Sequence, residues 1–113
     1  MNYNKVILAG NLTCQPELSY TSNGLGVCNF GLAFNSSYGE NSDTVFMDVT
    51  VWDKQAENCA KYLEKGSSVL VEGRLSLDTW EDKETGTKRS KMKCIASVVQ
   101  FGDSKKKTEP DNF

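Results

Sequence analysis

Large aromatic side chains occupy alternate positions in a segment with the pattern of a β-strand, from about residue 44 to 52. Successive side chains of a strand point to opposite faces, so Phe46 and Trp52, which are six residues apart, share one face. Asp48 and Thr50 lie on that same face, which is therefore expected to be solvated. The opposite face is apolar and is expected to point to the interior, with Val45, Met47, Val49 and Val51. Aromatic rings on a solvated sheet face can stack with unpaired nucleobases of any kind.

A third aromatic residue, Trp80, ends another predicted strand and shares its face with Arg74. The hairpin that follows is rich in cations, namely Lys83, Lys88, Arg89, Lys91 and Lys93. Such a cluster can neutralise phosphates, although many charged hairpins are merely solvated. Rings and cations on one face favour a single-stranded nucleic acid as the ligand. The alternative is structural, with these rings closing an end of the sheet or contacting a second subunit, and for Trp52 both roles stay equally open.

Residues suited to catalysis or to metal binding are scarce. The chain contains no histidine, which is the commonest general base and a frequent metal ligand. Its four cysteines never form a Cys-x-x-Cys pair and are expected to be reduced core residues; they are Cys14, Cys28, Cys59 and Cys94. We therefore expect a protein that is not an enzyme and that needs no metal and no cofactor.

Length and charge narrow the class of protein further. The 113 residues, with a mass of 12.5 kDa, allow one domain. The net charge is −2, and the positive charge is local, because residues 1–53 hold only Lys5 against five acidic side chains. No apolar run is long enough for a membrane span, and the N-terminus lacks the pattern of a secretion signal. We expect a cytoplasmic protein.

The apolar pattern predicts three strands, one helix and two further strands. Strands are expected at about residues 6–9, 28–35, 44–52, 67–80 and 90–101, with a polar loop at 36–43. Core positions in the second strand are Cys28, Phe30, Leu32 and Phe34. The helix is expected to be capped by Asp53 and stopped by Gly66, with apolar side chains at Ala56, Cys59, Ala60 and Leu63. This order is that of an OB-fold, a five-stranded Greek-key barrel with its helix between strands 3 and 4. Residues 1–101 would form this mostly-β domain, and residues 102–113 a flexible polar tail.

Over residues 4–101 the sequence resembles the bacterial-type single-stranded DNA-binding proteins. The resemblance rests on the opening NKVILAGNL with Pro16 and Glu17, and on the stretch VTVWDKQAENCAKYLEKGSSVLVEGRL. Trp80, the acidic glycine-containing hairpin after it and Val99-Gln100-Phe101 complete the match. The OB-fold that this family shares agrees with the element order.

The resemblance also implies roles for individual side chains. The rings that would stack with bases are Tyr38, Phe46, Trp52 and Trp80. The cations that would contact the DNA backbone are Lys5, Lys54, Lys65 and Arg74, to which the hairpin adds Lys88, Arg89 and Lys91. The chain departs from the family pattern at Glu40, Asp43 and Asp48, which are acidic where positive charge would help. We therefore expect weaker electrostatic attraction to DNA than is typical of the family.

The expected function is sequence-nonspecific binding of single-stranded DNA. The bound protein would coat and protect the DNA during replication, recombination and repair. The alternatives are a primosome-type accessory protein on the same barrel and a barrel that only binds other proteins. The run Val6–Ala9 is apolar on both faces, which predicts a dimer through this strand, and the resemblance extends this to a homotetramer built as a dimer of dimers. The end of the tail, Glu109–Phe113, is a reduced form of the family's partner-binding tip, so replication and repair proteins are expected partners there.

Overall fold

The computed structural model describes residues 1–38 and 41–102, with the side chains of residues 37, 38, 41 and 42 left out of the description. The elements are β1 (Val6–Leu12), β2 (Glu17–Tyr20), β3 (Gly26–Tyr38), β4 (Asn41–Trp52), α1 (Asp53–Tyr62), β5 (Ser68–Glu81) and β6 (Lys88–Phe101). The predicted tail, including Glu109–Phe113, lies almost entirely outside the described residues.

The strands form a sheet that closes on itself. Their order is β1-β5-β6-β4-β3-β2, and an additional pairing of β1 with β3 joins the two sides into a ring. All ring pairings are antiparallel except β4 with β6, which is parallel. The short strand β2 lies outside the ring and pairs only with β3. This closed ring of five strands confirms the predicted OB-fold.

The barrel interior is filled by the apolar face of each strand. Cys28, Phe30 and Leu32 of β3 are buried, as predicted, and Phe34 packs against the core while remaining partly exposed. The alternating pattern also holds in β4, where Val49 is fully buried. Each strand therefore contributes one apolar stripe to a single core and leaves its other stripe for contacts outside it.

The cysteines differ in burial. Cys28, Cys59 and Cys94 are buried and free, as predicted, whereas Cys14 is exposed, contrary to the expectation of a core residue. Cys14 follows the end of β1, beyond the apolar stripe that fills the barrel. Burial raises the pKa of the Cys59 thiol to about 12, which keeps it protonated and unreactive at neutral pH.

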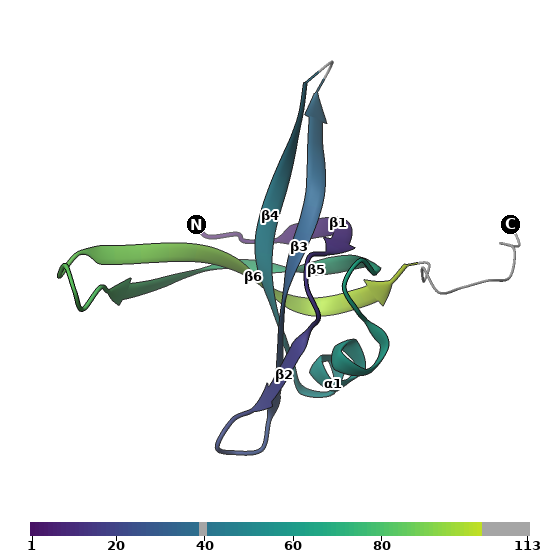
Figure 1. Ribbon diagram of the computed structural model, residues 1–113, viewed down its shortest axis with the longest axis horizontal. Coiled ribbons are helices and arrows are strands. Elements are labelled where there is room, and N and C mark those ends of the chain that lie inside the picture. The colour runs from purple at the N-terminus through teal and green to yellow at the C-terminus, as the bar shows by residue number, and fades with distance from the viewer. Residues whose placement is uncertain (39–40, 103–113) are drawn as a thin grey trace, which may run out of the picture.

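Two hairpins extend beyond the barrel as arms (Figure 1). One consists of β3 and β4, and the other of β5 and β6. The prediction of a polar loop at residues 36–43 is wrong, because Ser36 pairs with Asp43 and the two strands continue toward the tip of the first arm. A two-stranded ribbon outside the barrel has water on both faces, so its strands need no apolar residues and show no apolar alternation. The short β2 was not predicted either, since only Leu18 of its four residues packs against the core.

The helix α1 packs against β3 and β4 at one end of the barrel. Ala56, Cys59 and Leu63 are buried, as their spacing predicts. Asp53 does not cap the helix: it is the first helical residue, has a left-handed backbone (φ 67°), and follows the N-cap residue Trp52, whose side chain makes no capping bond. Within the described ranges, no helix is long and apolar enough to cross a membrane.

Candidate nucleic-acid interface

The strand register brings three of the four predicted aromatic residues to one face of the sheet. Asp48 of β4 pairs with Lys93 of β6, and Trp80 of β5 pairs with Arg89 of β6. Paired residues of neighbouring strands share a face, and every second residue along each strand follows them. We call this surface the aromatic face; it comprises Phe46, Asp48, Thr50 and Trp52 of β4, Arg74, Ser76, Asp78 and Trp80 of β5, and Arg89, Lys91 and Lys93 of β6.

The aromatic side chains of this face are open to solvent. The exposed fraction is 71% for Phe46, 47% for Trp80 and 40% for Trp52. None of the three belongs to the buried core of the chain, so stacking with a ligand and contact with a second subunit are the roles that stay open for them. The fourth predicted aromatic residue, Tyr38, is in β3 and pairs with Asn41, so its position is on the face of the first arm opposite Phe46. Its side chain lies outside the described part of the chain.

A hollow of about 390 Å³ lies beside these rings, over the middle of β3 and β4. Its lining includes the polar side chains of Glu17, Asn29, Asp48 and Thr50. Thr50 is only 5% exposed although it belongs to the aromatic face, and its hydroxyl donates a hydrogen bond to Asn29 Oδ1 over 2.8 Å. The floor of the hollow is thus a satisfied polar pair, which separates Trp52 from Phe46 along β4.

The three cations that β6 contributes to the aromatic face are engaged with carboxylates. Lys91 Nζ lies 2.7 Å from Asp48 Oδ2, and Lys93 Nζ lies 3.0 Å from Asp78 Oδ2. Arg89 Nε is 3.4 Å from Asp82 Oδ2. The hydrogen bond from Lys91 to Asp48 raises the pKa of Lys91 above its ordinary value. The hairpin therefore presents far less free positive charge than its sequence indicates.

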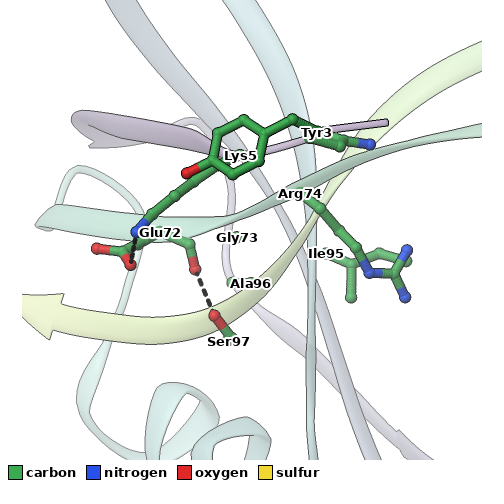
Figure 2. Close-up of a pocket in the computed structure, with 9 residues that line it drawn as sticks. Tyr3, Lys5, Glu72, Gly73, Arg74, Ile95, Ala96 and Ser97 are labelled. Atoms are coloured by element: carbon green, nitrogen blue, oxygen red, sulfur yellow. Dashed lines mark hydrogen bonds and ion pairs between the residues drawn. The ribbon is translucent and has the colours of Figure 1, made fainter. Parts of the chain in front are cut away.

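Arg74 and Lys5 lie beside a second cavity, of about 530 Å³. Lys5 Nζ forms an ion pair with Glu72 Oε2 at 3.0 Å, and Arg74 extends away from this pair (Figure 2). Arg74 is exposed and makes no ion pair with any residue that the structure describes. It is therefore a cation of the aromatic face that is available to an anionic ligand.

The other predicted contact residues lie elsewhere. Lys54 is in the first turn of α1, two residues after Trp52, and Lys65 is in the loop after the helix. Lys88 pairs with Glu81 and so occupies the opposite face of the β5–β6 arm from Trp80. The register thus gathers Phe46, Trp52, Trp80, Arg74, Arg89 and Lys91 on one face, and it does not gather Lys5, Lys54, Lys65 and Lys88 there.

Sequence reasoning missed the role of two acidic residues. From the sequence, Asp48 is notable only because it is acidic where positive charge would help DNA binding, and Asp78 carries no signal of a role. Their partners on β6 are far away in the sequence, and the parallel pairing of β4 with β6 that brings Asp48 to Lys91 has no local signal. Among the described residues, no cluster of three or more cysteine or acidic side chains is arranged to hold a metal ion.

Comparison with known proteins agrees with this geometry. The model of the Single-strand binding protein family matches residues 3–102. The chain is 42% identical to a single-stranded DNA-binding protein of Helicobacter hepaticus, covering 91% of this chain and 63% of the relative. It is 44% identical to one of Wolinella succinogenes, covering 91% and 66%. The chain thus spans less than two thirds of the length of these relatives.

A solved structure described as a Plasmodium falciparum SSB complex with ssDNA has a similar fold. Its TM-score is 0.81 at 27% sequence identity, and the alignment covers 91% of this chain and 97% of the other. The similarity therefore extends over most of the chain.

Proposed function

The chain belongs to the Single-strand binding protein family, and on this premise we propose that it binds single-stranded DNA without reading its sequence. Bases stack on Phe46, Trp52 and Trp80, while Arg74 and the lysines of β6 contact phosphates. The protein acts by holding the strand unpaired, and no bond is made or broken. In the cell this coats and protects single strands during replication, recombination and repair.

The observation that carries this proposal is the exposure of three aromatic rings on one sheet face beside cations. Stacking contributes about 1–3 kcal/mol per base and works for every base, because each has a π-face. A chain with a net charge of −2 cannot rely on a general attraction to a polyanion. Stacking is therefore the main source of affinity in this proposal, with phosphate contacts adding to it.

The proposal includes further residues that lie off the aromatic face. Tyr38 is kept in the proposal as a fourth stacking residue, although its position on β3, paired with Asn41, is on the other face of the first arm from Phe46. Lys5, Lys54, Lys65 and Lys88 contact the DNA as it passes around the barrel. Residues 102–113 serve as a tail whose end, Glu109–Phe113, binds replication or repair proteins. The place of action is the cytoplasm, with the nucleoid as the site of the DNA.

Titration with oligo-dT is expected to quench the tryptophan fluorescence strongly. The chain has two tryptophans, Trp52 and Trp80, and both lie on the aromatic face. Bases stacked on the indole rings quench emission, and the signal should saturate at a fixed number of nucleotides per protein. Duplex DNA of the same length is expected to have little effect, because its bases already stack on one another.

An unchanged emission spectrum at saturating oligo-dT, combined with no binding by a second method, would contradict the proposed function. A function in binding other proteins would then explain the exposed rings better. Equal quenching by duplex and single strands would also contradict it, since stacking requires unpaired bases.

We propose in addition that the protein is an oligomer, a dimer through β1 and a tetramer of two such dimers. The edge of β1 that faces away from β5 pairs with β3 only at Asn11 and Leu12, which leaves residues 6–10 open on that edge. Ile7 is 56% exposed on this strand, so a single barrel leaves one face of the apolar run uncovered. A second copy pairing with this edge would bury it and satisfy its backbone groups.

Light scattering on the purified protein is expected to give a mass of about 50 kDa, four times the chain mass of 12.5 kDa. Ile7→Asp should lower this mass, because a carboxylate cannot be buried without a partner. Leu25→Asp is the matched control, since Leu25 is 42% exposed in the turn between β2 and β3. A stable monomer at micromolar concentration would rule out the oligomer.

A further inference from the structure

Four charged side chains form two crossed ion pairs on the aromatic face, between Phe46 and Trp80. They are Asp48 of β4, Asp78 of β5, and Lys91 and Lys93 of β6. By register, Asp48 is opposite Lys93 and Asp78 is opposite Lys91. The ion pairs run diagonally instead, from Asp48 to Lys91 at 2.7 Å and from Asp78 to Lys93 at 3.0 Å. Each lysine is thereby turned toward a carboxylate on the next strand.

This arrangement leaves the pairs within reach of a ligand. The side chains of Asp48 and Lys91 are 50% and 65% exposed. That of Asp78 is 53% exposed and that of Lys93 is 27% exposed, so the Asp48–Lys91 pair is the more accessible of the two. Ion pairs with this degree of exposure contribute little to folding stability. A phosphate oxygen offers an ammonium group the same contact that a carboxylate oxygen does. A phosphate can therefore replace either carboxylate without opening the core.

We propose that Asp48 and Asp78 compete with the phosphates of a bound strand for Lys91 and Lys93, and that they thereby set the affinity and its salt dependence. This inference rests on the proposed function, which it deepens. A lysine that is paired with a carboxylate contributes less binding free energy on contact with a phosphate than an unpaired lysine does, because the contact with the carboxylate must first be broken. The two acidic residues then lie close to the entering phosphates and repel them.

The inference predicts how binding changes with salt. For a single strand, the logarithm of affinity falls with the logarithm of salt concentration by about 0.7 for each phosphate neutralised. The unmodified protein is expected to show a shallow slope, because its central lysines are occupied. Asp48→Asn frees Lys91, so the slope should steepen by up to about 0.7. At low salt the affinity should rise by about two- to fivefold, the range expected for breaking one exposed ion pair.

The test uses the full chain and a labelled oligo-dT, with fluorescence anisotropy measured over a range of salt concentrations. The variants are Asp48→Asn and Asp78→Asn, which are near-isosteric and replace exposed side chains. Glu81→Gln is the matched control: it removes the same charge near Asp78 on the β5–β6 arm, but from the opposite face, where Glu81 forms no ion pair within the described residues. It should leave the salt slope unchanged.

A double variant separates local competition from a general effect of charge. If Asp48 acts through Lys91, then Asp48→Asn should tighten binding in the natural chain but not in a chain that carries Lys91→Gln. Equal tightening in both backgrounds would overturn the inference, as would equal slopes for Asp48→Asn and Glu81→Gln. If the unmodified chain binds oligo-dT and Asp48→Asn changes neither affinity nor slope, the inference fails while the proposed function stands. If the unmodified chain does not bind oligo-dT at all, the proposed function fails, and this inference with it.

Discussion

Replacing Trp80 or Phe46 with alanine is expected to weaken the binding of oligo-dT by about 1–3 kcal/mol for each ring removed. The double variant should lose about 2–6 kcal/mol, because the two rings lie on different strands and stack with different bases. Neither ring fills the core: Phe46 is 71% exposed and Trp80 is 47% exposed. Their removal leaves no cavity, so the free energy of unfolding should change little. Anisotropy of a labelled oligo-dT measures the first quantity, and urea unfolding measures the second.

The matched control is Tyr62→Ala. Tyr62 is 60% exposed on α1, where its ring packs at a tilt against Phe101, with centroids 6.1 Å apart. It is a large exposed aromatic residue outside the aromatic face, and its loss should leave DNA affinity unchanged. If Phe46→Ala and Trp80→Ala change the DNA affinity as little as Tyr62→Ala does, stacking on this face is not the source of affinity. Unfolding of Trp80→Ala would show instead that this ring has a structural role.

The position of the aromatic rings could be predicted from the sequence because it depends on strand parity alone. Phe46 and Trp52 stand in a long strand whose alternate residues pack against the core, and this apolar stripe determines which residues face water. Trp80 is placed by counting the same alternation along β5 into the arm, where Leu77 of the other face is itself 57% exposed. The barrel could be predicted for a related reason, since every strand that enters the core carries that stripe. Parity fails only where the stripe ends, as it does in the arm beyond Ser36, where both faces of the ribbon are polar.

The charges of the site could not be predicted in the same way. The cations of residues 83–93 stand against a single acidic residue in their own segment, which indicates a free basic cluster. In the folded chain, Lys91 meets Asp48 from β4 and Lys93 meets Asp78 from β5. The first contact depends on the parallel pairing of β4 with β6, which is a property of barrel closure. The sequence shows the number of charges, and only the closed sheet shows which of them neutralise one another.

The second arm, formed by β5 and β6, has a register shift near its base. Between Glu72 and Gly73 the pairing of β5 with β6 moves by one residue, because Ser97 is inserted as a β-bulge. The Ser97 hydroxyl donates to the Glu72 carbonyl over 3.2 Å, and its own carbonyl accepts a hydrogen bond from Gln55 Nε2 over 2.7 Å. A bulge bends and twists its strand. This one lies where the strands leave the barrel, so it sets the direction of the arm that carries Trp80.

Gly73→Ala is expected to lower the free energy of unfolding by at least about 1–3 kcal/mol, the range for overpacking a filled site. A methyl group at this position would collide with the carbonyl of Ile95 and lie 2.8 Å from Ala96 Cα. Both are backbone atoms of the paired strand and cannot rotate away. The strands must separate at the bulge, which costs ladder hydrogen bonds and tilts the arm. Urea unfolding at a fixed protein concentration measures the loss.

Gly31→Ala is the control that isolates the backbone clash. A methyl group there would meet Thr13 Oγ1, which is a side-chain atom that can turn aside, so the loss should be clearly smaller. Because the bulge sets the direction of the arm, Gly73→Ala should also reduce oligo-dT affinity under conditions where the variant is still folded. Trp80→Ala should then lower the affinity less in a chain that carries Gly73→Ala than in the natural chain. Equal stability of the two glycine variants would mean that β5 and β6 can move apart freely at the bulge. The position of Trp80 would then not depend on this close approach of the two strands, and the arm would have to be fixed by the ion pairs that cross it.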